Sequence, residues 1–321
     1  MRVIFMGTPD FAAAILDAVY GAGHEICAAV TQPDRPKGRG KALAMSDVKL
    51  RAAELGIPVL QPERVRGNRE FADEVKRMDP DVIVVAAFGQ ILPKEILDIP
   101  RLGCINVHAS LLPKYRGSAP IQQAVLNGDE YAGVTTMQMG VGLDTGDMLE
   151  KASIRLKPDE TGGSLFERLA VLGAELIVST LKKAEAGTLK PEPQDDSLAS
   201  YAGMLDKKQG EIDWTKPAEV IERLVRGMNP WPTAYTYRGG KMLKLWKTEV
   251  IPAGEEPGIL KEALPGEAAL SGKDSFAVRC GEGVLKVLEV QPEGKKRMAS
   301  DAYLRGYPLT DGEVLGRTDC Q

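Results

Sequence analysis

Two polar residues near the middle of the chain, Asn106 and His108, could do acid–base chemistry together. The mostly apolar run at residues 104–107 predicts a short strand, which contains Asn106 and leads into His108. Residues two apart in a strand point to the same side of the sheet. Histidine is the side chain that most often serves as acid or base, although a histidine beside a strand is more often a hydrogen-bonded structural residue. The pair therefore marks a candidate site that needs a third group.

A glycine-punctuated loop, residues 140–147, supplies two carboxylates, Asp144 and Asp147. It follows a second strand-like run at residues 134–139. A carboxylate beside a histidine can orient the ring, hold its charge or share a proton with it. Spacing along the chain does not establish that proximity, so the contact is an expectation for the structure to test.

The motif SLLP, preceded by Asn-x-His and followed by GLDTGD, resembles the 10-formyltetrahydrofolate-dependent formyltransferases. The Asn-His-Asp set alone marks this wide family. A longer combination of motifs resembles the branch that acts on methionyl-tRNA, and it covers nearly the whole chain. These motifs are GTPDF (7–11), TQPDRP (31–36), IDW (212–214), NPWP (229–232), LEVQP (288–292) and GKK (294–296).

The resemblance implies transfer of a formyl group from 10-formyltetrahydrofolate to the free amino group of initiator methionyl-tRNA. Asn106 and His108 would then stabilise the oxyanion that forms on the formyl group. Asp144 would orient His108 and accept the proton of the attacking ammonium. No metal and no covalent intermediate are needed. The folate would be held by backbone contacts of Ser110, Leu111, Leu112 and Pro113, and the turn at residues 88–93 would line the pterin pocket.

The basic segment at residues 32–42 contains four cations and one acid, Asp34. Its two prolines and two glycines predict that it forms no regular element. A solvated surface loop is the ordinary interpretation of such a charge run. The resemblance instead implies a loop that enters the acceptor arm of the tRNA and meets its phosphates. The predicted tRNA-binding residues are Arg35, Lys37, Arg39 and Lys41.

The first half of the chain alternates apolar strands with amphipathic helices, which predicts a Rossmann-like parallel sheet with helices on both faces. The first turn reads Gly7-Thr8-Pro9 and lacks the GxGxxG fingerprint, which argues against nicotinamide or flavin binding. The predicted strands are residues 2–6, 25–31, 59–60 and 81–88, and the predicted helices are 9–21, 46–55, 68–78 and 162–185.

The second half of the chain has a different composition and a different pattern of apolar residues. Residues 188–202 are rich in polar residues and proline and are a linker by composition. Beyond a helix at 218–228, short strands predict a small antiparallel barrel, which the resemblance makes OB-like. We therefore expect a catalytic domain at 1–189, a linker at 190–206 and a tRNA-binding barrel domain at 207–321. The expected strands are 233–237, 241–246, 258–260, 275–279 and 284–290.

Two basic clusters lie in this half, and solvated strand faces and contacts to phosphate are both open interpretations of them. One cluster is Lys295, Lys296 and Arg297, and the other is Arg238, Lys241, Lys244 and Lys247.

Length and composition limit the class of protein to which the chain can belong. The 321 residues suffice for two buried cores. A net charge of −4 means that a polyanion must be met by local patches. The four cysteines are scattered, without a CxxC pair, which predicts neither a zinc site nor disulfides. No apolar run has membrane-spanning length, so we expect a cytoplasmic protein, acting as a monomer.

Three other functions remain open at this stage. Formyltransferases acting on sugar-nucleotide amines or glycinamide ribonucleotide would share the Asn-His-Asp set but would not need the basic loop and basic clusters. A formyltetrahydrofolate hydrolase would use the same site with water as acceptor. A catalytically idle tRNA-binding module could keep the loop and barrel, but the intact Asn-His-Asp set argues against it.

Overall fold

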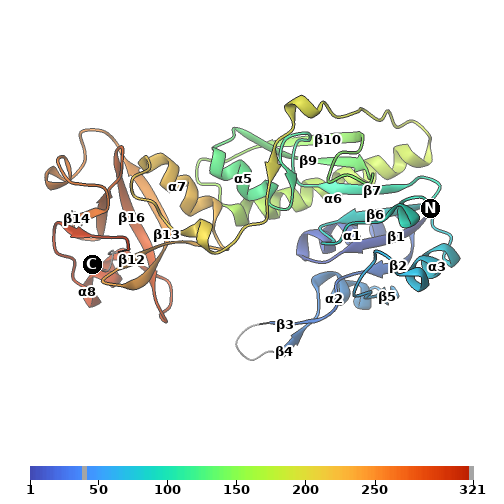
Figure 1. The fold of residues 1–321 in the computed structure, drawn as a ribbon, viewed down its shortest axis with the longest axis horizontal. Helices are drawn as coiled ribbons and strands as arrows, with labels where there is room; N and C mark the ends of the chain where they lie inside the picture. Colours follow the sequence, from blue (N-terminus) through green and yellow to red (C-terminus); the bar gives the residue numbers. More distant parts are fainter. Residues whose placement is uncertain (38–41, 318–321) are drawn as a thin grey trace. The chain divides into compact units, whose positions relative to one another are not determined.

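The computed structural model describes residues 1–37 and 42–317 and consists of two compact units (Figure 1). The first unit contains Met1–Pro120, Tyr131–Arg155 and Phe166–Gly203. The second contains Ile121–Glu130, Leu156–Leu165 and Met204–Gln321.

The first unit is built on a seven-stranded sheet of order β10-β9-β7-β6-β1-β2-β5. The five strands from β7 to β5 are parallel, which confirms the Rossmann-like prediction. At the other side β9 pairs antiparallel with β7 and β10 pairs antiparallel with β9. β10 was not predicted because only one of its eight residues is fully buried, as expected of an edge strand. The strands are β1 (Arg2–Gly7), β2 (Glu25–Val30), β5 (Val59–Leu60), β6 (Val82–Ala86), β7 (Cys104–His108), β9 (Tyr131–Gln138) and β10 (Met148–Arg155).

Helices cover both faces of this sheet. On one face Phe71 of α3 packs with Ile4 and Ile83 of the central strands. On the other face Phe11 of α1 meets Phe166 of α6, with ring centroids 5.7 Å apart. Side chains cap the N-termini of two of these helices: Ser46 Oγ accepts a hydrogen bond from Lys49 N at 3.0 Å, and Asn68 Oδ1 accepts one from Phe71 N at 3.0 Å. The helices up to α6 are α1 (Asp10–Gly21), α2 (Asp47–Glu54), α3 (Arg69–Arg77), α4 (Lys94–Leu97), α5 (Pro120–Asn127) and α6 (Gly162–Glu185). Of these, α5 beyond Pro120 and the start of α6, up to Leu165, belong to the second unit.

The basic segment at 32–42 contains regular structure, so the prediction of an entirely irregular loop is wrong. Its two ends pair antiparallel as β3 (Arg35–Lys37) and β4 (Ala42–Ala44), with Arg35 opposite Ala44. A two-stranded ribbon leaves one side of each strand unpaired. Pro36 can therefore occupy a strand there without removing a ladder hydrogen bond.

The second unit is a curled antiparallel sheet of order β12-β13-β16-β15-β14-β18, with β17 paired to β16, as the predicted small barrel requires. The expected strand at 258–260 is wrong: Gly258–Leu260 is a 3₁₀ turn that follows Pro257. The strands are β12 (Ala234–Arg238), β13 (Lys241–Ile251), β14 (Glu267–Ser271), β15 (Ser275–Arg279), β16 (Val284–Pro292), β17 (Met298–Ala299) and β18 (Glu313–Val314), and the helices are α7 (Ala218–Gly227) and α8 (Ser300–Gly306).

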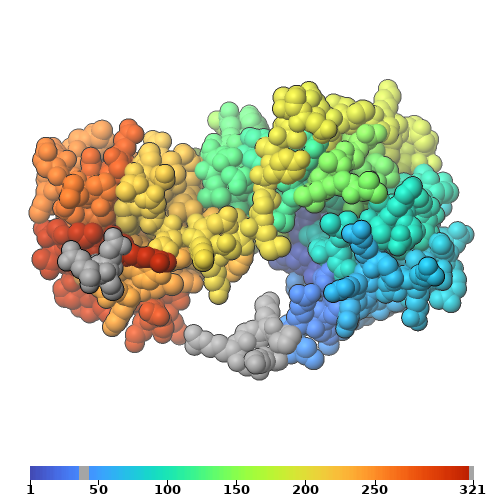
Figure 2. Space-filling view, viewed as in Figure 1, coloured from blue at the N-terminus to red at the C-terminus, as the bar shows by residue number. Residues whose placement is uncertain are grey.

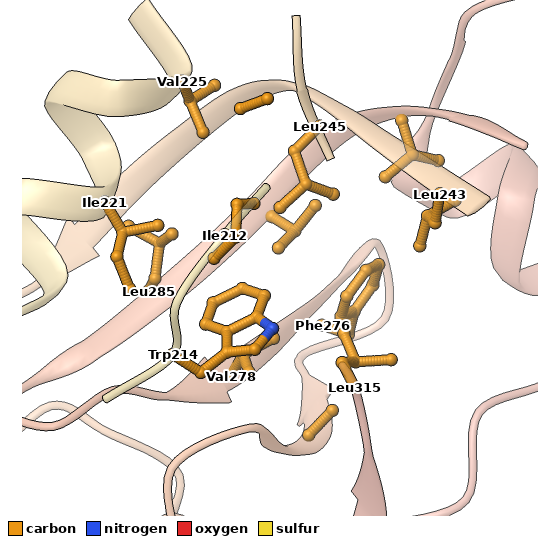
Figure 3. Close-up of a cluster of buried hydrophobic side chains, with 14 of the residues drawn as sticks. Ile212, Trp214, Ile221, Val225, Leu243, Leu245, Phe276, Val278, Leu285 and Leu315 are labelled. Carbon is orange, nitrogen blue, oxygen red and sulfur yellow. The ribbon is translucent and has the colours of Figure 1, made fainter. Parts of the chain in front are cut away.

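The core of the second unit is a cluster of buried side chains from this sheet, α7 and the segment before it (Figure 3). Trp214 lies between Leu285 and Phe276, two residues of the sheet, and Leu245 of β13 and Ile221 of α7 belong to the same cluster. The buried indole N–H of Trp214 donates to Thr236 Oγ1 at 3.0 Å, so this aromatic ring is buried without an unpaired polar group.

The segment around residues 190–203 runs along the surface of the first unit (yellow-green to yellow in Figure 2). Glu192 forms an antiparallel bridge with Met148. Further on, β11 (Tyr201–Ala202) pairs parallel with β8 (Arg116–Gly117). The domain limits at residues 189 and 206 stay a prediction.

Candidate active site

The carboxyl ends of the parallel strands meet at one edge of the first unit's sheet. Thr8, after β1, donates its hydroxyl to the Phe88 carbonyl at 3.2 Å. Gln32, after β2, donates Nε2 to the same carbonyl at 3.1 Å. β6 pairs with β7 through Val85 and Asn106. The turn at 88–93 thus lies at the same sheet edge as Asn106, as the sequence predicts, and this is where open α/β sheets place their sites.

Asn106 and His108 lie on one face of β7, opposite the face that packs on α6 through Val107. Both are nearly buried, with exposed fractions of 9% and 6%. Among the residues that the structure describes, none forms a hydrogen bond with the Asn106 amide. Buried amides are normally paired, so this group is available to a bound molecule.

His108 has one nitrogen committed and one facing the site. Its Nε2 lies 2.9 Å from the Tyr115 carbonyl oxygen. A carbonyl only accepts, so we assign the proton to Nε2, which donates to Tyr115. Nδ1 then carries the free lone pair of the neutral ring.

The structure brings Asp144 to this lone pair. Asp144 Oδ2 lies 3.8 Å from His108 Nδ1 and accepts a hydrogen bond from Gly117 N at 2.8 Å. The Asp144 backbone has φ +52°, in the left-handed region, which a non-glycine residue adopts at some cost. Asp147 is exposed, and only its carbonyl contacts the strand, accepting from Gln138 N at 2.8 Å. Of the two candidate carboxylates, Asp144 alone faces His108.

This geometry suits acyl transfer to an amine. The Nδ1 lone pair of neutral His108 and the Asp144 carboxylate are both acceptors, and they converge where a donor N–H would satisfy them. The Asn106 amide offers donors to a carbonyl oxygen. Burial raises the pKa of the neighbouring Cys104 thiol to about 12, so at neutral pH this cysteine is not a nucleophile.

Two glycines make the close approach of these segments possible. A Cβ on Gly146 would lie 1.7 Å from the Gln138 carbonyl oxygen. A Cβ on Gly117, whose φ is +111°, would lie 2.6 Å from the Ala202 oxygen. Any side chain at either position would displace the backbone that holds Asp144.

The predicted folate-binding turn, Ser110 to Pro113, is fixed by buried hydrogen bonds. Ser110 Oγ donates to the Lys114 carbonyl at 2.6 Å. Thr135 Oγ1 donates to the Ser110 carbonyl at 2.7 Å and accepts from Leu112 N at 3.1 Å. The Leu112 side chain is buried with Met137 and Met148. The turn is rigid, and the folate contacts of Ser110, Leu111, Leu112 and Pro113 stay a prediction.

Sequence reasoning missed two residues of this region. Arg116 carries no distinguishing pattern in the sequence, but it is 2% exposed. Its guanidinium donates to Gln194 Oε1 and, at 2.7 Å, to Asp196 Oδ1. Burial lowers the pKa of Arg116, but the hydrogen bonds and charges of Asp196 and Tyr201 together outweigh it, so the net shift is upward. Gln194 carried no signal, because a single glutamine in a polar segment is typical of a linker.

The predicted tRNA-binding residues are described only in part. Arg35 is exposed in β3, and its guanidinium reaches Gln32 Oε1 at 3.5 Å. Arg39 and Lys41 lie outside the described residues, as does the side chain of Lys37. The one acid of the segment, Asp34, accepts from Lys49 at 2.6 Å and from Gln61 at 2.8 Å. These hydrogen bonds, from Lys49 above all, lower the pKa of Asp34.

The basic clusters of the second unit divide into paired and unpaired residues. Arg238 is 13% exposed and forms an ion pair with Glu313 at 2.7 Å. Arg297 pairs with Glu289 and lies over the Trp246 ring, 4.9 Å from its centroid. Within residues 1–37 and 42–317, no ion pair involves the five lysines of the clusters: Lys241, Lys244, Lys247, Lys295 and Lys296.

The described part of the chain contains neither a metal-binding cluster nor a membrane-spanning helix. Its histidine, cysteine and carboxylate side chains form no group of three that could hold a metal ion. None of its helices is long and apolar enough to cross a membrane.

Comparison with solved structures shows the fold. A tetrahydrofolic acid complex of HypX from Aquifex aeolicus superposes with a TM-score of 0.63 at 15% identity, covering 99% of this chain and 51% of that one. An N-formyltransferase from Helicobacter canadensis, solved with folinic acid and dTDP-3-aminofucose, gives a TM-score of 0.66 at 17% identity and covers 91% of this chain and 99% of that one.

Comparison with sequences identifies the family. The formyl transferase profile matches residues 1–181, and the formyl transferase C-terminal domain profile matches residues 204–308. The methionyl-tRNA formyltransferase of Lachnospira eligens is 55% identical over 98% of this chain and 100% of its own length. That of Agathobacter rectalis is 52% identical over 98% of this chain and 99% of its own. At this identity and coverage, the chain belongs to the methionyl-tRNA formyltransferases of the formyl transferase family.

Proposed function

We propose that this protein transfers the formyl group of 10-formyltetrahydrofolate to the amino group of initiator methionyl-tRNA, producing N-formylmethionyl-tRNA for translation initiation. The observation that carries the proposal is the convergence of Asn106, His108 and Asp144 at one sheet edge. It occurs in a chain whose relatives of the same length are methionyl-tRNA formyltransferases.

The attacking amine must lose a proton to become a nucleophile. The Asp144 carboxylate and the Nδ1 lone pair of His108, 3.8 Å apart, are the acceptors for it. The Nε2 hydrogen bond to the Tyr115 carbonyl keeps the His108 ring in this orientation. Asp144 takes the ammonium proton, and His108 holds the amine N–H on the attacking line.

Attack places negative charge on the formyl oxygen. The unpaired Asn106 amide donates to that oxygen as the charge grows, at a nearly buried position where water competes weakly. Once His108 Nδ1 has taken the second proton of the amine, its N–H donates a second hydrogen bond to that oxygen. The new carbon–nitrogen bond forms on the amine, whose second proton passes to His108 Nδ1 and then to solvent. The bond to the folate nitrogen breaks, and the proton held at Asp144 goes to the departing nitrogen. The products are the formylated amine and tetrahydrofolate.

Binding of the two substrates divides between separate groups. The backbone of the rigid turn from Ser110 to Pro113 would position the folate. Phosphates of the acceptor arm would be met by the basic segment. The proposed contacts are Arg35, Lys37, Arg39 and Lys41.

The lysines of the second unit would add phosphate contacts in a tRNA-binding domain at 207–321, which the linker at 190–206 joins to the catalytic domain at 1–189. The protein would act in the cytoplasm, as a monomer and without a metal.

An acceptor screen tests this function. Purified protein and 10-formyltetrahydrofolate are offered aminoacylated initiator tRNA, free methionine, a sugar-nucleotide amine or water alone. We expect rapid formylation of methionyl-tRNA, slowed by added salt because counterion release weakens phosphate contacts. Efficient turnover of a small amine, or of water, with none on methionyl-tRNA would refute the proposal.

A further inference from the structure

The Gln194 side chain bridges two segments of the active site. Its Nε2 donates to the carbonyl oxygens of Asp144 and Gly146, both at 2.8 Å. Its Oε1 accepts from Arg116 Nε at 3.0 Å and from Arg116 Nη2 at 2.9 Å. A carboxamide has two donor hydrogens and two acceptor lone pairs, so every hydrogen-bonding position of Gln194 is used.

The orientation of this amide is fixed by its partners. Carbonyl oxygens only accept and a guanidinium only donates. A flipped amide would place its oxygen against two carbonyl oxygens and its N–H groups against a guanidinium. All four hydrogen bonds would be lost, and like partial charges would face each other. Gln194 therefore specifies one arrangement of the loop that carries Asp144.

That loop needs an external restraint. Asp144 has φ +52°, an unfavourable conformation that persists only where the surroundings determine it. Gln194 holds the Asp144 carbonyl, and Gly117 N holds the Asp144 carboxylate at 2.8 Å. The two contacts fix the backbone and the side-chain oxygen of the same residue.

The buried Arg116 extends the restraint to His108. Its two neighbours contact the catalytic pair: the Tyr115 carbonyl accepts from His108 Nε2, and Gly117 N donates to Asp144. The backbone of this three-residue segment is held in turn by the segment that carries Gln194, since Arg116 N donates to the Ser200 carbonyl at 2.8 Å. One hydrogen-bonded network thus orients His108 and Asp144.

We propose that Gln194 is a positioning residue for formyl transfer: it touches no substrate and acts by aiming the Asp144 carboxylate at the amine beside His108. This inference rests on the proposed function, because it concerns the rate of the same reaction.

The test compares Gln194→Met with Glu192→Met. Methionine keeps the length and volume of glutamine but has no strong hydrogen-bonding group. Glu192 lies two residues earlier, is exposed, and pairs with Met148 through its backbone only, so it is a matched control. We expect Gln194→Met to lower kcat about tenfold or more, with KM for both substrates within about twofold of wild type. The control should keep wild-type kcat.

A double-mutant cycle separates positioning from general structure. In an Asp144→Asn background the carboxylate is already lost, so Gln194→Met should cost less than about threefold in kcat. Tm should stay close to wild type in both single variants. If Gln194→Met folds poorly, Gln194→Glu keeps the length but sets a carboxylate against two carbonyls, and the same loss of kcat is expected.

Wild-type kcat in Gln194→Met, or a full loss repeated in the Asp144→Asn background, would overturn the role of Gln194. The wild-type protein is assayed alongside. A wild-type protein that does not formylate methionyl-tRNA would refute the proposed function instead, so the two failures are distinct.

Discussion

The active-site edge of the first unit and the basic clusters of the second unit differ in how their polar groups are satisfied. The Asn106 amide has no partner among the described residues, although it is nearly buried. Arg238, in the second unit, donates to Glu313, to the Tyr303 hydroxyl and to the carbonyls of Tyr307 and Pro308. A polar side chain without partners is available to a substrate, whereas one with a full set of partners stabilises the fold.

The same contrast limits what charge alone can predict. Arg238 and Arg297 belong to runs that suggested phosphate contacts, yet both are paired with a glutamate. The lysines of the same runs have no ion pair in the part of the chain that the structure describes. We therefore expect the lysines of the second unit to bind phosphate and the two arginines to stabilise the fold.

Substitution of the site residues should have the largest effect. Asn106→Ala, His108→Ala and Asp144→Asn should each lower kcat about a hundredfold or more, since each removes a group that acts on the reacting atoms. Combined losses should be smaller than the product of the single losses. Steady-state kinetics on methionyl-tRNA and thermal melts check this, and wild-type activity in Asp144→Asn would remove that residue from the mechanism.

Substitution of Arg238 should act on stability instead. Arg238→Met leaves Glu313 and Tyr303 without their partner and should cost about 2 kcal/mol of unfolding free energy, between typical surface and buried pairs. Lys241→Met, at an exposed position, is the control and should change stability by less than about 0.5 kcal/mol. Urea titrations measure both, and equal stabilities of the two variants would contradict the structural role of Arg238.

The loss of unfolding free energy in Arg238→Met should depend on pH. Hydrogen bonds from Arg238 lower the pKa of Glu313 below its usual value of 4.5. A lowered carboxyl pKa contributes stability above the ordinary pKa and loses it as the pH falls through the folded-state value. The difference between wild type and Arg238→Met should therefore be full at neutral pH and shrink in acid below the ordinary pKa. A difference that is constant down to acid would contradict the ion pair.

The basic segment should give the smallest effect. Arg39→Ala with Lys41→Ala should raise KM for methionyl-tRNA several-fold and reduce the salt slope of kcat/KM by up to about two units. Folate affinity should not change, because the segment is not assigned to that pocket. Unchanged kinetics with an unchanged salt slope would make these two residues ordinary solvated charges.

Much of this architecture follows from local sequence. The near-continuous apolar run at residues 81–88 predicts a strand that is buried on both faces, and all five residues of β6 are buried. The positions of Asn106 and His108 follow from the two-residue period of a strand. The approach of Asp144 did not follow, because it depends on how a loop folds back over β7.

What the sequence could not predict involves partners distant along the chain. Arg116 is one of several arginines until Gln194 and Asp196 meet it, and Gln194 has no local pattern. The strands β3 and β4 were missed because proline and glycine signals dominate the prediction for short segments, while an isolated ribbon accommodates Pro36 in β3. Residue types predicted the chemistry, but the supporting hydrogen bonds required tertiary structure.

The most direct test of the account measures the chemical step alone. Single-turnover formylation of methionyl-tRNA, with enzyme and 10-formyltetrahydrofolate saturating, is compared between Asp144→Asn and Arg39→Ala with Lys41→Ala. The account predicts a rate constant about a hundredfold or more below wild type for Asp144→Asn, and one within about twofold of wild type for the double variant. Equal rate constants in the two proteins would contradict the assignment of chemistry to the sheet edge and of tRNA binding to the basic segment.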